Sequence, residues 1–196
     1  MNRDPAARPR LWLVRHGETD WSRLGRHTSR TDIPLTEAGR TQAVALAARL
    51  TGQRFAEVLT SPMSRAAETA RITGFGDLAT ITDDLREWDY GRDEGRTTSE
   101  IQMDRPGWSL WGDGPQEGET IAEVAIRADR IVEHARLAPG DTLCFGHGHM
   151  LRVLAARWLE LEPQLGSRFA LSTATLSVLG WEHKMPVIER WNESPD

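Results

Sequence analysis

Two short apolar runs, far apart in this chain of 196 residues, each lead into a histidine. Residues 10–14 precede Arg15-His16-Gly17, and residues 141–145 precede a glycine and then His147. Runs of this length and composition predict buried β-strands. In a parallel sheet the strands end on one edge, where open α/β sheets place their ligands. We therefore expect His16 and His147 to face one site.

Strand and helix patterns alternate along the rest of the chain. Short apolar runs predict further strands at 56–60, 78–82, 174–182 and 187–191. Apolar residues at helical spacing and capping residues predict helices at 36–50, 61–74, 120–137 and 151–159. This alternation predicts an α/β fold with three layers, α/β/α, and a mostly parallel central sheet. Residues 92–118 interrupt the pattern and are long enough to form a lid.

Length and composition set the domain count and exclude some functions. With 39% apolar and 27% charged residues, we expect one domain over 10–196 and a flexible segment over 1–9. No stretch approaches the roughly 18 apolar residues of a membrane span. The net charge of −5 argues against a general nucleic-acid surface. The single cysteine, Cys144, cannot form an internal disulfide, which fits a reducing cytoplasm.

The residue types around the two histidines indicate phosphate chemistry. A neutral imidazole can attack phosphorus through one nitrogen while a hydrogen bond holds the other. Arg15 is a permanent cation whose planar fork fits phosphate oxygens, and Gly17 leaves room for a ligand. Arg65 follows the strand 56–60 in the first turn of a helix, whose N-terminus favours anions. Taken alone, the tripeptide 15–17 fits a strand end with a surface charge equally well.

Five motifs distinguish these alternatives. They are Arg-His-Gly-Glu-Thr at 15–19, Pro-Leu-Thr-Glu-Ala-Gly at 34–39, the segments 61–70 and 85–91, and Gly-His-Gly-His at 146–149. In this order they resemble the histidine phosphatase superfamily, in its phosphoglycerate-mutase-like branch, over nearly the whole chain. The resemblance implies the α/β/α fold of that branch and a two-step phosphoryl transfer that needs neither metal nor cofactor.

The resemblance also implies a role for individual residues. His16 would attack phosphorus and become phosphohistidine, while Arg15, Arg65 and His147 would bind the transferred phosphoryl group. Glu87 matches the acid of the superfamily, which protonates the leaving oxygen and then draws a proton from water. Asp89 is the alternative acid. Substrate contacts are expected at Ser22, Arg26, His27, Thr28 and Gly148.

Several residues keep a second interpretation. His147 and His149, with His16 or His27, are alternatively zinc ligands, although the arginines would repel a dication. Trp108 and Trp111 either close over the ligand or only pack their loop. A second anionic group of the substrate would bind at Arg26, His27, Arg92 and Arg96, unless these side chains form a solvated surface.

Departures from the superfamily pattern bear on the reaction. Ser22 stands where many relatives have asparagine and can still donate one hydrogen bond to phosphate, and Ser29 stands where glycine is frequent. Glu87 and His147 are only 60 positions apart, whereas mutases carry a longer insertion that keeps water from the phosphohistidine. Hydrolysis is therefore expected, with phosphoglycerate mutase activity as the alternative.

The expected substrate is a small phosphorylated metabolite, such as a sugar phosphate. Segments 25–28, 87–91 and 166–170 resemble small broad-specificity acid phosphatases and sedoheptulose-bisphosphatase-like members of the branch. A phosphate- or phosphoprotein-binding module without turnover is the alternative of another class, but both the nucleophile and the acid are present. We expect a cytoplasmic enzyme with no nucleic-acid or membrane partner. A homodimer is compatible with the sequence.

Overall fold

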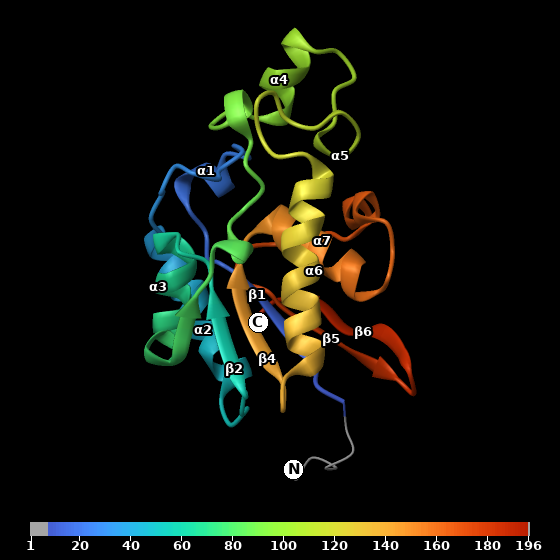
Figure 1. Ribbon diagram of the computed structural model, residues 1–196. Coiled ribbons are helices and arrows are strands. Elements are labelled where there is room, and N and C mark those ends of the chain that lie inside the picture. Colours follow the sequence, from blue (N-terminus) through green and yellow to red (C-terminus); the bar gives the residue numbers. More distant parts are fainter. Residues whose placement is uncertain (1–7, 196) are drawn as a thin grey trace.

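A six-stranded sheet forms the centre of the structure, a computed structural model that describes residues 8–195 (Figure 1). The strand order is β3 (Ala79–Ile81), β2 (Glu57–Thr60), β4 (Thr142–Gly146), β1 (Leu11–Arg15), β5 (Leu176–Glu182) and β6 (Met185–Glu193). The first four strands are parallel to one another, and β5 and β6 are antiparallel to their neighbours. The predicted mostly parallel sheet is therefore confirmed.

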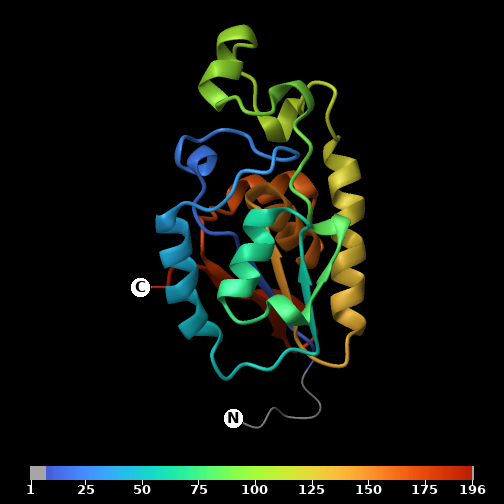
Figure 2. The ribbon, with the colours of Figure 1, turned by 90° about the vertical axis from the view of Figure 1, so that its left-hand side faces the viewer.

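Helices cover both faces of this sheet (Figures 1 and 2). Apolar residues of α2 (Glu37–Leu50) and α3 (Ser64–Ile72) form one core with Trp12 and Val14 of β1. Those of α6 (Ile121–Leu137) and α7 (Gly148–Trp158) form the other core with Leu11 and Leu13. The alternation along β1 sends successive side chains to opposite faces, which produces the three layers. Within residues 8–195, no helix combines the length and apolar character needed to cross a membrane.

Shorter helices lie mainly beyond the carboxyl ends of the parallel strands. Figure 1 shows α1 (Asp20–Arg23), α4 (Thr98–Asp104) and α5 (Leu110–Asp113) above the sheet, so the segment 92–118 lies over its carboxyl edge. Within residues 8–195 there are also four 3-10 turns, η1 (Gly76–Leu78), η2 (Asp83–Leu85), η3 (Gly91–Asp93) and η4 (Pro163–Arg168).

Side-chain caps explain where two predicted helices begin. Thr36 accepts a hydrogen bond from the backbone of Gly39 at the start of α2. Thr120 and Glu123 form a reciprocal capping box at the start of α6. Both helices therefore begin as predicted.

Two other helix starts were predicted wrongly. α7 begins at Gly148 and not at Leu151, because the Glu87 carboxylate accepts the N–H groups of its first turn. α3 begins at Ser64, because the Ser61 hydroxyl accepts from the Met63 backbone before the helix forms.

The loop after β1 packs directly against α2. A Cβ on Gly17 would lie 2.4 Å from the carbonyl oxygen of Gly39, and one on Gly39 would lie 2.2 Å from that of Glu18. The sequence predicted that Gly17 leaves room for a ligand, and this prediction is wrong. Gly17 instead leaves room for the backbone of α2.

Only two residues of the expected flexible segment 1–9 belong to the described part of the chain. Trp181 donates its indole N–H to the carbonyl of Pro9 at 2.8 Å, and the Arg8 guanidinium lies 4.6 Å from the Trp181 ring centroid. Residues 1–7 lie outside the described residues.

Candidate active site

A cavity of about 360 Å³ lies at the carboxyl ends of β1 and β4, between the sheet and the segment 98–111. Its wall contains eight of the ten predicted site residues, Arg15, His16, Ser22, Arg26, His27, Thr28, Glu87 and Gly148. The strand ends supply Arg15 and His16, as expected for a parallel sheet. The structure therefore brings the ends of distant segments to one cavity.

The ring of His16 has one tautomer set by its surroundings. Its Nδ1 lies 2.7 Å from the carbonyl oxygen of Gly17, which can only accept, so Nδ1 carries the proton. Burial, and then the charges of Arg15 and Arg65, hold the pKa of His16 well below its usual range. The imidazole is therefore neutral, with its lone pair on Nε2.

Arg15 is held by one contact and keeps unused donors. Its Nη1 donates to the carbonyl of Leu171 at 2.5 Å, while its buried Nε has no partner among the described residues. A Cβ on Gly148 would lie 3.3 Å from the guanidinium carbon, so this glycine leaves Arg15 its room. The unsatisfied donor of a buried cation is suited to an anionic ligand.

Arg65 and His147 lie next to His16 but outside the cavity wall. Both side chains are fully buried, and the rings of His16 and His147 are 5.2 Å apart. Arg65 donates from Nε to His147 Nδ1 at 3.2 Å, so His147 carries its proton on Nε2 and donates it to Ser61 Oγ at 2.8 Å. Burial and Arg65 lower the pKa of His147 far below its usual range.

The remaining donors of Arg65 fix the loop that borders the cavity. They reach the carbonyl oxygens of Thr28, Ser29 and Thr31 at 3.2–3.3 Å. A direct contact of Arg65 or His147 with a phosphoryl group stays a prediction.

Glu87 points its carboxylate at the first turn of α7. It accepts backbone hydrogen bonds from Trp88 at 3.0 Å, His149 at 3.0 Å and Met150 at 2.8 Å. Glu87 is 6% exposed and lines the cavity. Its alternative, Asp89, instead pairs with Arg30 at 2.5 Å in the wall of a second cavity. The geometry favours Glu87 as the acid.

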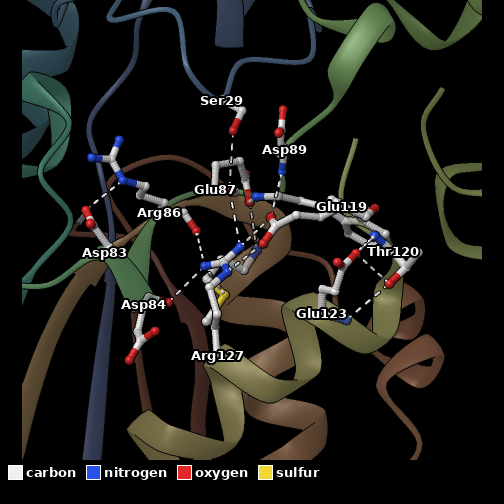
Figure 3. Close-up of polar contacts among 12 residues, drawn as sticks. Ser29, Asp83, Asp84, Arg86, Glu87, Asp89, Glu119, Thr120, Glu123 and Arg127 are labelled. Atoms are coloured by element: carbon white, nitrogen blue, oxygen red, sulfur yellow. Dashed lines mark hydrogen bonds and ion pairs between the residues drawn. The ribbon is translucent and has the colours of Figure 1, made fainter. Parts of the chain in front are cut away.

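Arg127 of α6 holds the segment that carries Glu87 (Figure 3). Its guanidinium binds both carboxylate oxygens of Glu119, at 2.7 and 2.8 Å. It also donates to the carbonyl oxygens of Asp84, Arg86 and Glu87 at 3.0, 2.9 and 3.5 Å. One arginine thereby ties the backbone on both sides of the candidate acid to a long helix.

Two serines that depart from the superfamily pattern have structural partners. The Ser22 hydroxyl donates to the Thr19 carbonyl at 3.0 Å and accepts from the Thr19 backbone at 2.9 Å. Its one proton is thus engaged, and the expected donation to phosphate is absent from this arrangement. Ser29 Oγ donates to the carbonyl of Glu87 at 3.2 Å, which adds a second anchor for that segment (Figure 3).

The four residues expected to bind a second anion divide into two pairs. Arg92 pairs with Glu117 at 2.6 Å, and Arg96 pairs with Asp104, both outside the cavity wall. Arg26 and His27 do line the cavity. For Arg92 and Arg96 the surface interpretation is therefore correct.

Both tryptophans of the segment 92–118 line the cavity and also pack their surroundings. Trp108 is 3% exposed and donates its indole N–H to the Gly114 carbonyl at 2.8 Å. Trp111 meets Trp88 edge-on, with ring centroids 5.7 Å apart. Packing of the loop and closure over a ligand are therefore compatible roles for Trp108 and Trp111.

The cavity wall also contains Tyr90 and Arg152, for which the sequence predicted no role, and His149, which the sequence offered only as an alternative zinc ligand. Tyr90 and His149 share a hydrogen bond of 2.7 Å, and burial lowers the pKa of His149 and raises that of Tyr90. Tyr90 and His149 lie within the motif segments 85–91 and 146–149, so their position in a motif could have indicated a place in the site. Arg152 has no motif around it.

The zinc interpretation finds no ligand cluster. Among residues 8–195, no three His, Cys, Asp or Glu side chains converge in the manner of a metal site. Both nitrogens of His147 are engaged by Arg65 and Ser61, and His149 Nδ1 by Tyr90.

Comparison with known proteins gives consistent matches over almost the full chain. The model of the histidine phosphatase superfamily (branch 1) matches residues 11–194. An acid phosphatase of Mycobacterium tuberculosis is 44% identical over 179 residues, which cover 89% of this chain and 87% of that protein. Sedoheptulose 1,7-bisphosphatase of Saccharomyces cerevisiae is 33% identical over 193 residues, with coverage of 82% and 71%.

A solved structure agrees with these sequence matches. Mycobacterial glucosyl-3-phosphoglycerate phosphatase in complex with VO3 superposes with a TM-score of 0.85 at 30% identity. The match covers 96% of this chain and 100% of that one.

Proposed function

This chain belongs to branch 1 of the histidine phosphatase superfamily and is a phosphoric monoester hydrolase, and we propose that it acts on small phosphomonoesters through a phosphohistidine on His16. One observation carries the proposal: the neutral His16, with its proton fixed on Nδ1, keeps the Nε2 lone pair in a cavity shared with Arg15 and Glu87. An unprotonated ring nitrogen is what in-line attack on phosphorus requires.

The proposed reaction has two steps. In the first, His16 Nε2 forms a bond to phosphorus, the bond from phosphorus to the leaving oxygen breaks, and Glu87 gives that oxygen a proton. In the second, water attacks phosphorus, the P–N bond breaks, and Glu87 takes the proton of the water. Arg15, with its unpartnered Nε, would meet the charge on the transferred oxygens, and no metal is required for that task.

The substrate class follows from the relatives and the cavity. The named relatives act on a sugar bisphosphate and a phosphorylated glucosyl glycerate, and the cavity of about 360 Å³ fits a small metabolite. A sugar phosphate or a similar phosphomonoester is therefore the proposed substrate. A cytoplasmic location and a homodimer stay predictions.

The covalent intermediate provides the test. Enzyme mixed with a sugar phosphate and quenched in alkali, where phosphohistidine survives, is analysed by peptide mass spectrometry. We expect phosphate on His16 in the native protein and none in His16→Ala, which should also release no inorganic phosphate. His183→Asn is the matched control, because His183 lies in an exposed turn with positive φ that asparagine tolerates.

Three results would overturn the proposal. They are hydrolysis by His16→Ala in chelator-treated protein, phosphate on another residue, and binding of phosphoesters without any turnover. Product analysis with 3-phosphoglycerate distinguishes the hydrolase from the alternative, a phosphoglycerate mutase. A hydrolase releases inorganic phosphate, whereas a mutase forms 2-phosphoglycerate.

A further inference from the structure

The arginines of the cavity wall differ in whether they have a carboxylate partner. Arg26 lies 3.6 Å from a carboxylate oxygen of Glu100. Within residues 8–195, Arg15 and Arg152 line the cavity with no carboxylate within 4.0 Å. The Arg15 charge belongs to the phosphoryl site proposed above. The Arg152 charge has no assigned role.

Two backbone carbonyls and an aromatic ring hold the Arg152 guanidinium in place. Its Nε donates to Gly166 at 3.1 Å and its Nη2 donates to Ser167 at 3.0 Å. The group lies 4.7 Å from the ring centroid of Trp111, which is within the range of a cation–π contact. Nη1 makes no hydrogen bond within the described chain, so donors remain for a ligand.

The neighbours of Arg152 form a fitted wall. A Cβ on Gly166 would lie 2.8 Å from the Arg152 carbonyl oxygen and 3.0 Å from the Trp111 ring, so only glycine leaves the Arg152 backbone and the Trp111 side chain in position. Trp111 is itself fixed against Trp88 and against His149, whose ring centroid is 5.5 Å away. A rigid, stacked guanidinium is suited to planar recognition of an anion.

The partial burial of Arg152 and its lack of a contacting carboxylate among the described residues both favour an anionic ligand beside it. Burial is the largest cause that lowers the pKa of Arg152; the negative charge of Glu87 opposes it, and the positive charge of Arg15 adds to it. A partly buried cation with no carboxylate in contact destabilises the empty cavity, and an anionic group on the ligand would relieve this cost. By contrast, Glu100 already meets the Arg26 charge, and burial lowers the pKa of His27 and favours its neutral form.

We propose that Arg152, backed by Trp111, binds a second anionic group on the leaving-group side of the substrate. The preferred substrate is then a phosphomonoester that also carries a carboxylate or a second phosphate. The inference rests on the proposed function, because His16 and Arg15 take the transferred phosphoryl group. It replaces Arg26 and His27, the cavity residues first expected to hold that group.

Matched substrate pairs test the subsite. 3-Phosphoglycerate is compared with glycerol 3-phosphate for the carboxylate, and fructose 1,6-bisphosphate with fructose 6-phosphate for the second phosphate. We expect Arg152→Met to lower kcat/KM roughly 10- to 100-fold for the doubly anionic member of at least one pair. The loss for its singly anionic partner should stay below about threefold. The pair with the larger loss identifies the anion.

Two further variants separate binding from structure. Arg152→Lys keeps the charge without the fork and should recover part of the discrimination. Arg168→Met removes an exposed arginine of the same region, which lies outside the cavity, and should leave both pairs unchanged. An equal loss for both members of each pair would assign Arg152 a structural role and overturn the subsite. The proposed function fails separately, if the native enzyme releases no phosphate from any of the four.

Discussion

At the scale of single residues, Glu87 and Asp89 lie two positions apart yet face different cavities. We predict that Glu87→Gln lowers kcat for a sugar phosphate about 100- to 10,000-fold, because the leaving alkoxide loses its proton donor. Asp89→Asn keeps an oxygen that can accept the backbone N–H of Gly91 and loses the ion pair with the exposed Arg30, so it should change kcat less than about threefold. Steady-state release of inorganic phosphate measures both.

A substrate with a stable leaving group separates proton donation from packing. p-Nitrophenolate leaves without a proton, so Glu87→Gln should still release it in one rapid burst. Turnover would then be slow, because the attacking water lacks its base. Equal loss of burst and turnover would contradict the assignment of Glu87 as acid and base.

The sequence predicted the site residues that directly follow a strand. It did not predict residues whose role depends on their neighbours in three dimensions. Arg15 and His16 follow β1, so the sheet edge alone places them in the cavity. The engagement of the Ser22 hydroxyl by Thr19 depends on loop geometry that residue identity does not set. Arg152 looks like any helical arginine until the charges around it are known.

At the scale of elements, α6 supports the site through Arg127, which is 12% exposed at its side chain. We predict that Arg127→Met destabilises the protein by about 2–3 kcal/mol, because Glu119 loses its cationic partner and the carbonyl oxygens of Asp84 and Arg86 lose their side-chain donor. It should also lower kcat about tenfold, as the segment carrying Glu87 loosens. Chemical denaturation and steady-state kinetics measure the two effects.

Arg130 on the same helix is the matched control. It binds the side chain of Asp84 in the same segment, but its own side chain is 53% exposed. Arg130→Met should therefore cost less than about 1 kcal/mol and leave kcat unchanged. Equal effects of the two substitutions would show that Arg127 acts only as a surface charge.

The start of α7 shows why element boundaries were harder to predict than elements. The apolar pattern of residues 151–159 marked the helix, but three residues before it show no apolar periodicity. They are helical because a carboxylate from residue 87 accepts the N–H groups of the first turn. A cap supplied from 62 and 63 positions earlier in the chain leaves no local signal in the sequence.

At the scale of the whole molecule, the three layers were predictable from the sequence, but the shape of the segment 92–118 over the cavity was not. Alternating strands and helices with two apolar faces admit few arrangements, so the sheet and its flanking helices follow from the pattern. The segment 92–118 contains only short helices, α4 and α5, and gains its shape from contacts such as that of Trp108 with Gly114. Contacts of this kind become visible only in three dimensions.

Four histidines around the cavity make the stability of the whole molecule depend on pH. Burial is the largest cause that lowers the pKa of His16, His27, His147 and His149. In the unfolded chain each returns to an ordinary pKa of about 6.5, so below that pH the unfolded state binds more protons than the folded state. Stability is therefore retained above about pH 6.5 and falls as the pH drops below it, by up to about 5 kcal/mol per pH unit.

Urea unfolding at several pH values between 7.5 and 5 checks this dependence. The midpoint should be constant at the upper end and should decline steadily below about pH 6.5. His27→Gln removes one of the four groups, so its slope should be shallower by about 1.4 kcal/mol per pH unit. Inorganic phosphate should raise the midpoint throughout, because it binds only the folded state. A midpoint that stays level down to pH 5 would mean that these histidines titrate alike in the folded and unfolded states.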